Sequence, residues 1–247
     1  MALFEAHHLH KRFGDQVVLE DISLRFEENC LSGIMGPNGA GKTTCFNVLT
    51  GRYKPNRGKV LFAGEDITGL PPRRIARKGI ARSFQTMNLF DEYTALDNVV
   101  LALPRVRTRG FEMLHNLGAN REARDEAAAV LARIGLRGQE TSLAGDLSYG
   151  QRRALEIGIA VAAEPRLLFL DEPTAGLGTE ATVALAELIQ TLRRDITIVV
   201  IEHDMKFLFG LADHIFVIHW GQVIAEGSPA QLRVNPWVQR SNLGELA

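Results

Sequence analysis

The chain has 247 residues, of which 46% are hydrophobic and 23% are charged. This balance is typical of a globular protein with a sizeable core, built as one large α/β domain or two small ones. Lys and Arg number 28 against 29 Asp and Glu, for a formal net charge of -1. The chain therefore lacks the overall positive field that draws proteins to nucleic acid or to an anionic membrane.

Cysteine content and hydropathy indicate the cellular compartment in which the chain works. The two cysteines, Cys30 and Cys45, are too few for a disulfide framework and are typical of a reducing cytosol. The N-terminal residues show no long apolar core and no small-residue cleavage site, which argues against a signal peptide. No segment approaches the roughly 18 consecutive apolar residues that a membrane span needs, so we expect another chain to hold this one at any membrane.

The predicted elements of the first half are mainly strands, followed by a helical block. Alternating apolar residues predict strands at 3–8 and 17–26, and an apolar run predicts a strand at 31–35. After that come, in order, a helix at 45–50, a strand at 59–62, a helix that begins at two prolines and ends at Gly79, a strand at 80–84 and a helical insertion at 94–138.

In the second half, buried strands alternate with helices, which predicts a mostly parallel sheet and an α/β fold. The expected elements are a helix at 148–163, a strand at 167–170, a helix at 179–194, a strand at 196–201 and a hairpin of 214–220 with 222–226. Ser228 and Gln231 have the spacing of a helix capping box, with Pro229 at the first helical position.

The stretch GPNGAGKTT lies between the strand at 31–35 and the next helix, and its spacing fits the phosphate-binding loop G-x-x-x-x-G-K-[ST]. Glycines let consecutive N–H groups point at phosphate oxygens, and the helix start adds its positive end. Lys42 adds a charge at the β- and γ-phosphates, and the Thr43 hydroxyl suits Mg²⁺. The predicted nucleotide-binding residues of this loop are Gly36, Pro37, Asn38, Gly39, Ala40, Gly41, Lys42, Thr43 and Thr44.

A second motif, LLFLDE, places two carboxylates at the end of a strand with no polar residue. Ligands bind at this end of the strands in open α/β sheets. We predict that Asp171 holds Mg²⁺ through water and that Glu172 polarises the attacking water as a general base. The alternative is an acidic pair that caps the next helix.

A third motif is LSYGQ, in which Ser148 and Gln151 again have capping-box spacing. The ordinary interpretation is a well-formed helix start. A helix N-terminus with a nearby serine and glycine is also a receptor for a γ-phosphate, which makes Ser148, Gly150 and Gln151 candidate nucleotide contacts.

With these motifs in this order, the sequence resembles the ATP-binding subunits of ATP-binding cassette (ABC) transporters over essentially its whole length. The family signature is LSGGQ, and Tyr149 here replaces its first glycine, as is common in the branched-chain amino-acid importer subgroup. The stretches IARKGIARSFQTMNLF, IEHDMKF and RSNLGELA are also similar to that subgroup.

The resemblance implies a P-loop NTPase (RecA-like) core with an antiparallel β subdomain and an α-helical subdomain. We expect one domain, with the core and β subdomain at about 1–93 and 164–247 and the helical subdomain with the signature at about 94–163. It also implies that Phe13 stacks on adenine, that Gln85 at the lobe junction is a metal-binding and catalytic residue, and that His203 is a catalytic switch. Taken alone, Phe13 could be a core aromatic and Gln85 a surface amide. His203 could be a hydrogen-bonded histidine at a strand end.

One position departs from the family pattern. After DEPTAGL the family usually has Asp or Asn, whereas this chain has Gly178. A carboxylate there helps to couple the two sites of a dimer, so the strength of that coupling is in question.

The resemblance further implies a head-to-tail dimer, homo- or heteromeric, with two ATP molecules between the protomers. The implied partners are integral-membrane permease subunits and, indirectly, a periplasmic or extracellular substrate-binding protein, with the chain peripheral at the cytoplasmic face of the membrane. We expect no nucleic-acid partner, because the basic run of Arg73, Arg74, Arg77 and Lys78 lacks interleaved aromatics.

The leading hypothesis is therefore the ATPase of an importer of branched-chain or hydrophobic amino acids. A urea or amide importer and a lipid exporter use nearly the same ATPase, so the cargo stays open. A soluble ABC ATPase acting on DNA or ribosomes is a further alternative, weakened by the single cassette and the lack of heptad arms. A guanine-nucleotide switch protein would need an N-K-x-D base reader, which the sequence lacks.

Overall fold

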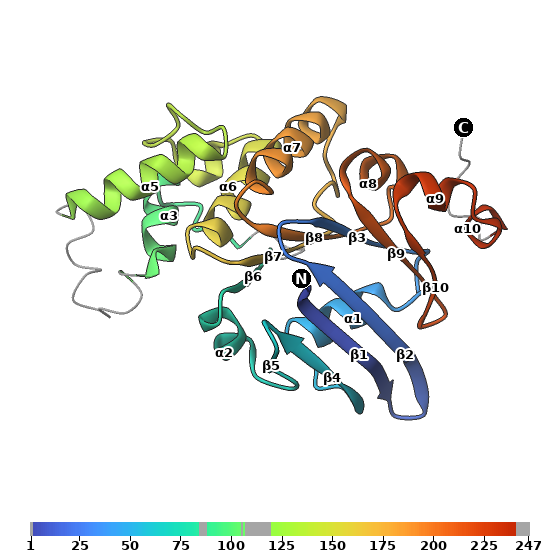
Figure 1. Ribbon diagram of the computed structural model, residues 1–247. Helices are drawn as coiled ribbons and strands as arrows, with labels where there is room; N and C mark the ends of the chain where they lie inside the picture. Colours follow the sequence, from blue (N-terminus) through green and yellow to red (C-terminus); the bar gives the residue numbers. More distant parts are fainter. Residues whose placement is uncertain (1, 84–87, 105, 107–119, 241–247) are drawn as a thin grey trace.

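Two sheets organise the computed structural model, which describes residues 2–83, 88–104, 106 and 120–240 (Figure 1). The first is antiparallel, with strand order β2-β1-β4-β5. Its strands are β1 (Ala2–Phe13), β2 (Gln16–Glu27), β4 (Arg57–Phe62) and β5 (Glu65–Asp66).

The second sheet has the strand order β10-β9-β3-β8-β7-β6. Its strands are β3 (Leu31–Met35), β6 (Ile80–Arg82), β7 (Leu167–Asp171), β8 (Thr197–Glu202), β9 (His214–His219) and β10 (Gln222–Gly227). All neighbours pair in parallel except β9 and β10, which form an antiparallel hairpin. The carboxyl ends of β3, β8 and β7 therefore lie side by side at one edge of this sheet.

Helices cover one face of the parallel sheet, and the antiparallel sheet lies on the other side together with the first helix (Figure 1). The described helices are α1 (Lys42–Leu49), α2 (Pro72–Arg77), α3 (Ala95–Ala102), α5 (Arg121–Arg133), α6 (Tyr149–Val161), α7 (Thr179–Leu192), α8 (Met205–Leu211), α9 (Pro229–Arg233) and α10 (Pro236–Arg240), with a 3₁₀ turn at Ala144–Asp146. No helix among these residues is both long and apolar enough to cross a bilayer.

The alternation of side chains along β7 shows how one strand serves two cores. Leu168 and Leu170 pack with the helices, whereas Leu167 and Phe169 face α1 and the antiparallel sheet. The ring of Phe169 lies 5.5 Å from that of Phe4 and 6.0 Å from that of Phe46. This buried aromatic cluster joins the two sheets and fixes the position of α1, which carries the phosphate loop at its start.

The structure confirms the α/β class, the mostly parallel sheet and the order of the predicted strands. Several bounds differ. Strands β1 and β2 each run to 12 residues, because they form a long hairpin ladder that includes polar residues. Helix α1 begins at Lys42 rather than at residue 45, so the last residues of the phosphate loop are already helical. The predicted strand at 80–84 is seen as β6 to Arg82, and residues 84–87 lie outside the described part.

Among the described residues, four short elements were not predicted: β5, the 3₁₀ turn at Ala144–Asp146, α8 and α10. The case of α8 is instructive. The Asp204 side chain accepts a hydrogen bond from the Phe207 backbone N–H at 3.1 Å and so begins the helix, while Phe207, Leu208 and Leu211 are buried. The predicted capping boxes at Ser148–Gln151 and Ser228–Gln231 are both present.

Candidate functional site

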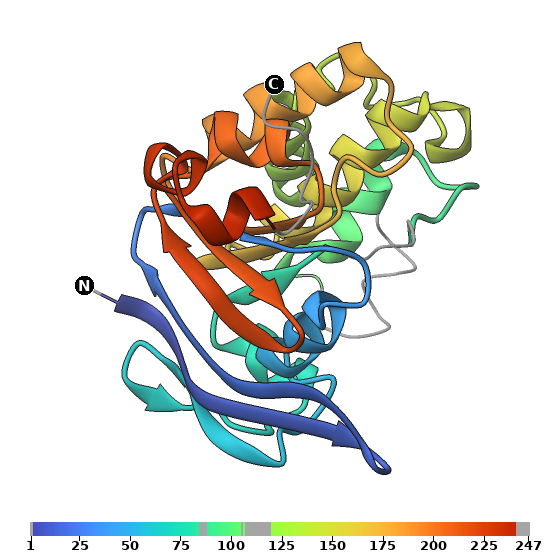
Figure 2. The ribbon, with the colours of Figure 1, turned by 90° about the vertical axis from the view of Figure 1, so that its right-hand side faces the viewer.

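The phosphate loop is held from behind by the β9–β10 hairpin. The Gly221 N–H donates to the Ala40 carbonyl at 3.0 Å, and Figure 2 shows the tip of this hairpin beside the start of α1. A Cβ on Gly36 would come within 2.1 Å of the Ile218 carbonyl oxygen, so only glycine fits there. Gly41 has φ of 101° and precedes α1, which no side chain caps. The N–H groups of the first turn of α1 are thus left for a ligand.

Lys42 lies inside this loop with 5% of its surface exposed. Its ammonium donates to the carbonyl oxygens of Gly36, at 2.7 Å, and Pro37, at 3.0 Å. Burial lowers the pKa of Lys42, and the negative charges of Glu172, Glu202 and Asp171 act in the opposite direction. A buried cation is thus already aimed into the loop, as an anion site requires.

The acidic pair follows β7 at the same edge of the sheet. Asp171 is buried, and its burial, with the charge of Glu172 next in size, raises its pKa to about 6. Glu172 adopts φ of 44°, in the left-handed region that non-glycine residues rarely enter. Its N–H still donates to Ile201 of β8 at 2.8 Å. Strained backbone of this kind concentrates at functional sites, and Glu172 is the residue for which the sequence predicts the role of general base.

His203 follows β8 and faces Glu172. Its Nδ1 lies 3.9 Å from Glu172 Oε1 and 3.6 Å from Glu202 Oε2. About half of the His203 side chain is exposed. The structure therefore brings together two predicted residues that are 31 positions apart in the chain, because β7 and β8 are neighbours in the sheet.

Phe13 lies at the end of β1 with 42% of its surface exposed, which rules out the alternative of a core aromatic. Its ring meets Tyr53 edge-on at 5.2 Å, and Lys11 Nζ lies 4.9 Å from the Phe13 centroid. Tyr53 went unnoticed in the sequence, because its pairing with Phe13 depends on tertiary folding.

The signature residues Ser148, Gly150 and Gln151 lie at the start of α6, whereas the phosphate loop lies at the start of α1. The Gln151 N–H donates to Ser148 Oγ at 3.3 Å, and the Ser148 N–H donates to Gln151 Oε1 at 2.9 Å. A Cβ on Gly150 would come within 3.1 Å of the Ala181 Cβ, so this helix start packs closely on α7. Gln85, the remaining predicted residue, lies outside the described residues.

Sequence reasoning also missed two residues that hold the turn after Glu172. The Tyr149 hydroxyl donates to the Ala175 carbonyl at 3.2 Å. Glu202, fully buried at the end of β8, accepts hydrogen bonds from Thr174, His203 and Asp204. The signal for Glu202 was a carboxylate at the end of an apolar strand, the same signal that identified Asp171.

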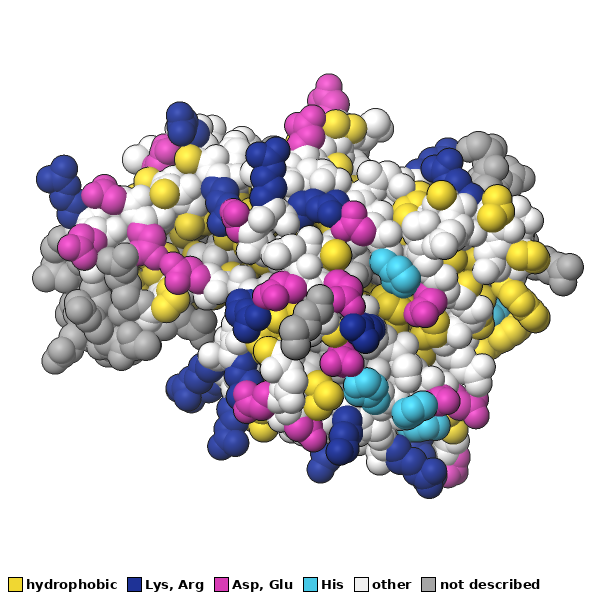
Figure 3. Space-filling view, viewed as in Figure 1, with side chains coloured by type: hydrophobic (Ala, Val, Ile, Leu, Met, Phe, Trp, Pro, Cys, Tyr) yellow, Lys and Arg dark blue, Asp and Glu magenta, His cyan; other side chains and the backbone are white. Residues whose placement is uncertain are grey.

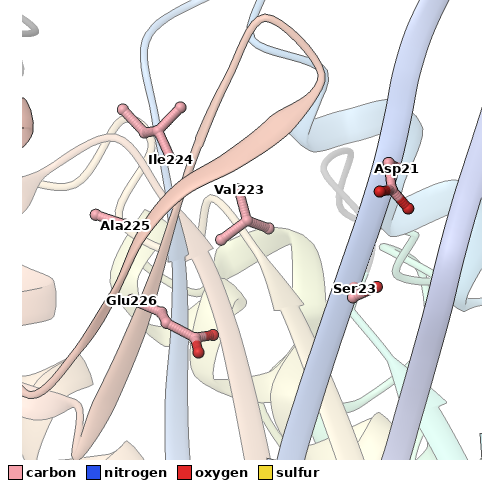
Figure 4. Close-up of a pocket in the computed structure, with 6 residues that line it drawn as sticks. All are labelled: Asp21, Ser23, Val223, Ile224, Ala225 and Glu226. Carbon is pink, nitrogen blue, oxygen red and sulfur yellow. The ribbon is translucent and has the colours of Figure 1, made fainter.

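A separate cavity of about 450 Å³ lies between the edge strands of the two sheets (Figure 4). Asp21 and Ser23 line it from β2, and residues 223–226 line it from β10. None of the predicted site residues lines this cavity. On the face shown in Figure 3, the described basic and acidic side chains are interspersed rather than gathered by sign.

Comparison with known proteins settles the family. The model of the family described as ABC transporter matches residues 19–175. This chain belongs to the ABC transporter family. It is 43% identical to the "High-affinity branched-chain amino acid transport ATP-binding protein BraF" of Pseudomonas aeruginosa, over 98% of each chain.

Solved structures of ABC cassettes have the same fold. One is the ADP conformation of MJ1267, an ATP-binding cassette of an ABC transporter, with a TM-score of 0.87, 30% identity and coverage of 99% of this chain and 100% of that one. Another is a dimeric post-hydrolysis state of the ATP-binding cassette MJ0796 bound to ADP and Pi, with a TM-score of 0.76, 26% identity and coverage of 92% and 98%. The chain is thus an ABC ATPase that binds ATP.

We predict that Lys42→Ala weakens binding of MgATP by at least about tenfold, since charge-assisted hydrogen bonds contribute about 1.5–3 kcal/mol each. Isothermal titration calorimetry on the purified chain measures this. Lys59→Ala, which removes an exposed lysine of β4, is the control and should bind as the wild type does. An unchanged Kd for Lys42→Ala would contradict a role of this ammonium at the phosphates.

Asp171→Asn should stabilise the nucleotide-free protein at pH 7.5. The folded carboxyl keeps its proton to a pKa of about 6, against an ordinary 3.8, so folding loses stability as the pH rises from about 4 to about 6. The loss above pH 6 is at most about 3 kcal/mol. Urea unfolding should therefore show a larger gain for Asp171→Asn at pH 7.5 than at pH 5.

The control for this measurement is Asp125→Asn, an exposed position on α5, which should leave stability unchanged at both pH values. If Asp171→Asn is less stable than the wild type at pH 7.5, or equally stabilised at both pH values, the charge of Asp171 does not destabilise the nucleotide-free protein.

Proposed function

We propose that this chain is the ATP-hydrolysing subunit of a membrane importer for branched-chain amino acids. The observation that carries the chemistry is the grouping at one sheet edge of Lys42, Asp171, Glu172 and His203 beside the phosphate loop. The cargo class rests on the similarity to BraF across nearly the whole of both chains.

In this proposal the loop from Gly36 to Thr44 holds the phosphates, with Lys42 exchanging its present carbonyl partners for phosphate oxygens. Phe13 stacks on the adenine, supported from the side by Tyr53. The three signature residues Ser148, Gly150 and Gln151 act at the nucleotide of a second subunit.

The donor set also fits Mg²⁺, a cation that prefers oxygen ligands and keeps several waters. Asp171 is a buried carboxylate whose pKa is raised by burial and by Glu172, and a dication beside it would relieve both effects. Thr43 would contribute its hydroxyl and Gln85 its amide oxygen. Magnesium, when bound, supplies charge that neutralises the phosphates.

Glu172 is proposed as the general base that polarises the attacking water. Its side chain is about one-fifth exposed, so that a water can reach it at the sheet edge. His203 is close enough to respond to a shift of that carboxylate and would position the water or the γ-phosphate. Glu172 and His203 thus act as a pair, while Lys42 and the loop amides hold the charge that develops.

The proposed working unit is a head-to-tail dimer. A single phosphate loop leaves the γ-phosphate partly open, and the start of α6 from the partner would close it and exclude water. The helix start suits this role because its capping box is preformed and Ser148 is exposed. In this arrangement about 1–93 and 164–247 form the nucleotide-binding core with the β subdomain, and about 94–163 form the helical subdomain.

We further propose that the dimer is peripheral on the cytoplasmic face of the membrane, where it drives permease subunits by rigid-body closure and opening. A substrate-binding protein outside the membrane would deliver the amino acid. The second ATPase subunit is another copy of this chain or a related one.

Glu172→Gln should bind MgATP within about threefold of the wild type but hydrolyse it at least about 100-fold more slowly, because the general base is lost. With ATP uncleaved, a stable dimer should accumulate, measured by size-exclusion chromatography with light scattering. Glu187→Gln, an exposed position on α7, should behave as the wild type does. Rapid turnover by Glu172→Gln would remove Glu172 from the base role.

The transport role is tested by purifying the tagged chain from gently solubilised membranes of its native host. We expect polytopic permease subunits to co-purify, and the complex in proteoliposomes with its binding protein to take up labelled leucine on addition of MgATP. Labelled urea is the matched cargo control. Uptake of urea but not leucine would reassign the cargo, and recovery of ribosomes or DNA in place of permeases would overturn the transport role.

A further inference from the structure

Glu202, the last residue of β8, is a carboxylate with no exposed surface. Its two oxygens accept hydrogen bonds from different loops. Oε1 accepts from the Thr174 backbone N–H at 3.0 Å and from the Thr174 hydroxyl. Oε2 accepts from the backbone N–H groups of His203, at 3.0 Å, and Asp204, at 3.4 Å. One side chain therefore bridges the loop after β7 and the loop after β8.

Burying a carboxylate costs several kcal/mol unless its oxygens are satisfied, so these contacts are not incidental. Each donor lies in one of the two loops that carry the reacting groups. In this arrangement each carboxylate oxygen binds the donors of one loop, whereas an amide would present its oxygen to one loop and an NH₂ group to the N–H donors of the other. The chemistry of this position therefore calls for a carboxylate rather than an amide or a hydroxyl.

The first loop transmits the contact to Glu172. Thr174 lies two residues beyond Glu172, and the Ala175 N–H donates to the Glu172 carbonyl at 3.1 Å. Anchoring Thr174 thus holds the turn in which Glu172 adopts its left-handed φ of 44°. Loss of the anchor would remove one of the contacts that hold this unfavourable backbone conformation in place.

The second loop transmits the contact to His203, whose own N–H is bound to Glu202. The ring of His203 then lies 3.9 Å from the Glu172 carboxylate. The distance between these two side chains depends on the relative position of the two loops, and the Glu202 side chain hydrogen-bonds to both of them.

We propose that Glu202 is a positioning residue for ATP hydrolysis, which sets the geometry between Glu172 and His203 by holding both of their loops. The inference rests on the proposed roles of Glu172 and His203. Glu202 itself touches neither nucleotide nor water in this scheme and acts only through the two loops.

The test uses three single variants of the full chain. Glu202→Gln keeps the size but replaces one acceptor oxygen by an NH₂ group, so one loop loses its partner. Thr174→Val removes the hydroxyl and keeps the backbone N–H, and Thr174→Ser restores the hydroxyl. Thr191→Val is the matched control, because the Thr191 hydroxyl donates to the Glu187 carbonyl within α7.

Steady-state MgATP hydrolysis and equilibrium MgATP binding are measured for each variant, with thermal unfolding as a check on folding. We expect Glu202→Gln and Thr174→Val to lower kcat at least about tenfold while KM and Kd stay within about threefold, since neither residue is among those proposed to hold the phosphates. Thr174→Ser should recover most of kcat. Combining Glu202→Gln with Thr174→Val should lower kcat no further than Glu202→Gln alone.

Folded variants with unchanged kcat, or a Thr174→Ser variant as slow as Thr174→Val, would overturn the inference. A parallel loss of kcat, nucleotide binding and thermal stability would also overturn it, since that is the pattern of a purely structural residue. If Glu202→Gln does not fold, the Thr174 series gives the answer. The proposed function fails separately, by rapid turnover of Glu172→Gln.

Discussion

Buried charge at one edge of the parallel sheet is the constraint on which this structure depends. Lys42, Asp171 and Glu202 are each at most 5% exposed and lie where β3, β7 and β8 end. Burying any one of these charged groups alone costs free energy. The raised pKa of Asp171 is one effect of that burial. In the proposed function the phosphates would pair with Lys42 and a dication would offset the carboxylates, so ligand binding would lower the cost of burying these charges.

The rest of the fold serves to hold that edge rigid. The Phe169 cluster ties β7 to α1 and the antiparallel sheet, and the β9–β10 hairpin supports the phosphate loop through Gly221. Rigid support matters because groups misplaced by about 1 Å lose much of their effect on a transition state. On the opposite face of the sheet, the start of α6 lies at the surface, with Ser148 exposed.

Most of what could be predicted of the fold and the site came from patterns of residues that are close together in the sequence. The phosphate loop, both capping boxes and the apolar strands depend on residues close in sequence, so their chemistry is visible before folding. Tyr53 could not be recognised in this way, because its contact with Phe13 forms only when the chain folds. Glu202 has a local signal, its place at the end of an apolar strand, but its bond to Thr174 forms only when β7 and β8 become neighbours. The predicted start of α1 was three residues too late. The usual sign of a helix start is a capping side chain, and α1 has none, because glycine stands at its N-cap position.

The turn between β7 and α7 bears on the unusual Gly178. This residue precedes α7 and offers no side chain to cap it, whereas the family usually has a carboxylate or amide there. In this chain the turn is instead held at Thr174 by Glu202 and at Ala175 by Tyr149, the residue that departs from the family signature. A Cβ on Gly176 would meet the Tyr149 ring, so the aromatic packs directly on the turn. Two contacts within the subunit thus restrain this turn, which has no side chain at Gly178 to hold it. The Tyr149 contact also joins the turn to the start of α6, which is proposed to face the partner's nucleotide.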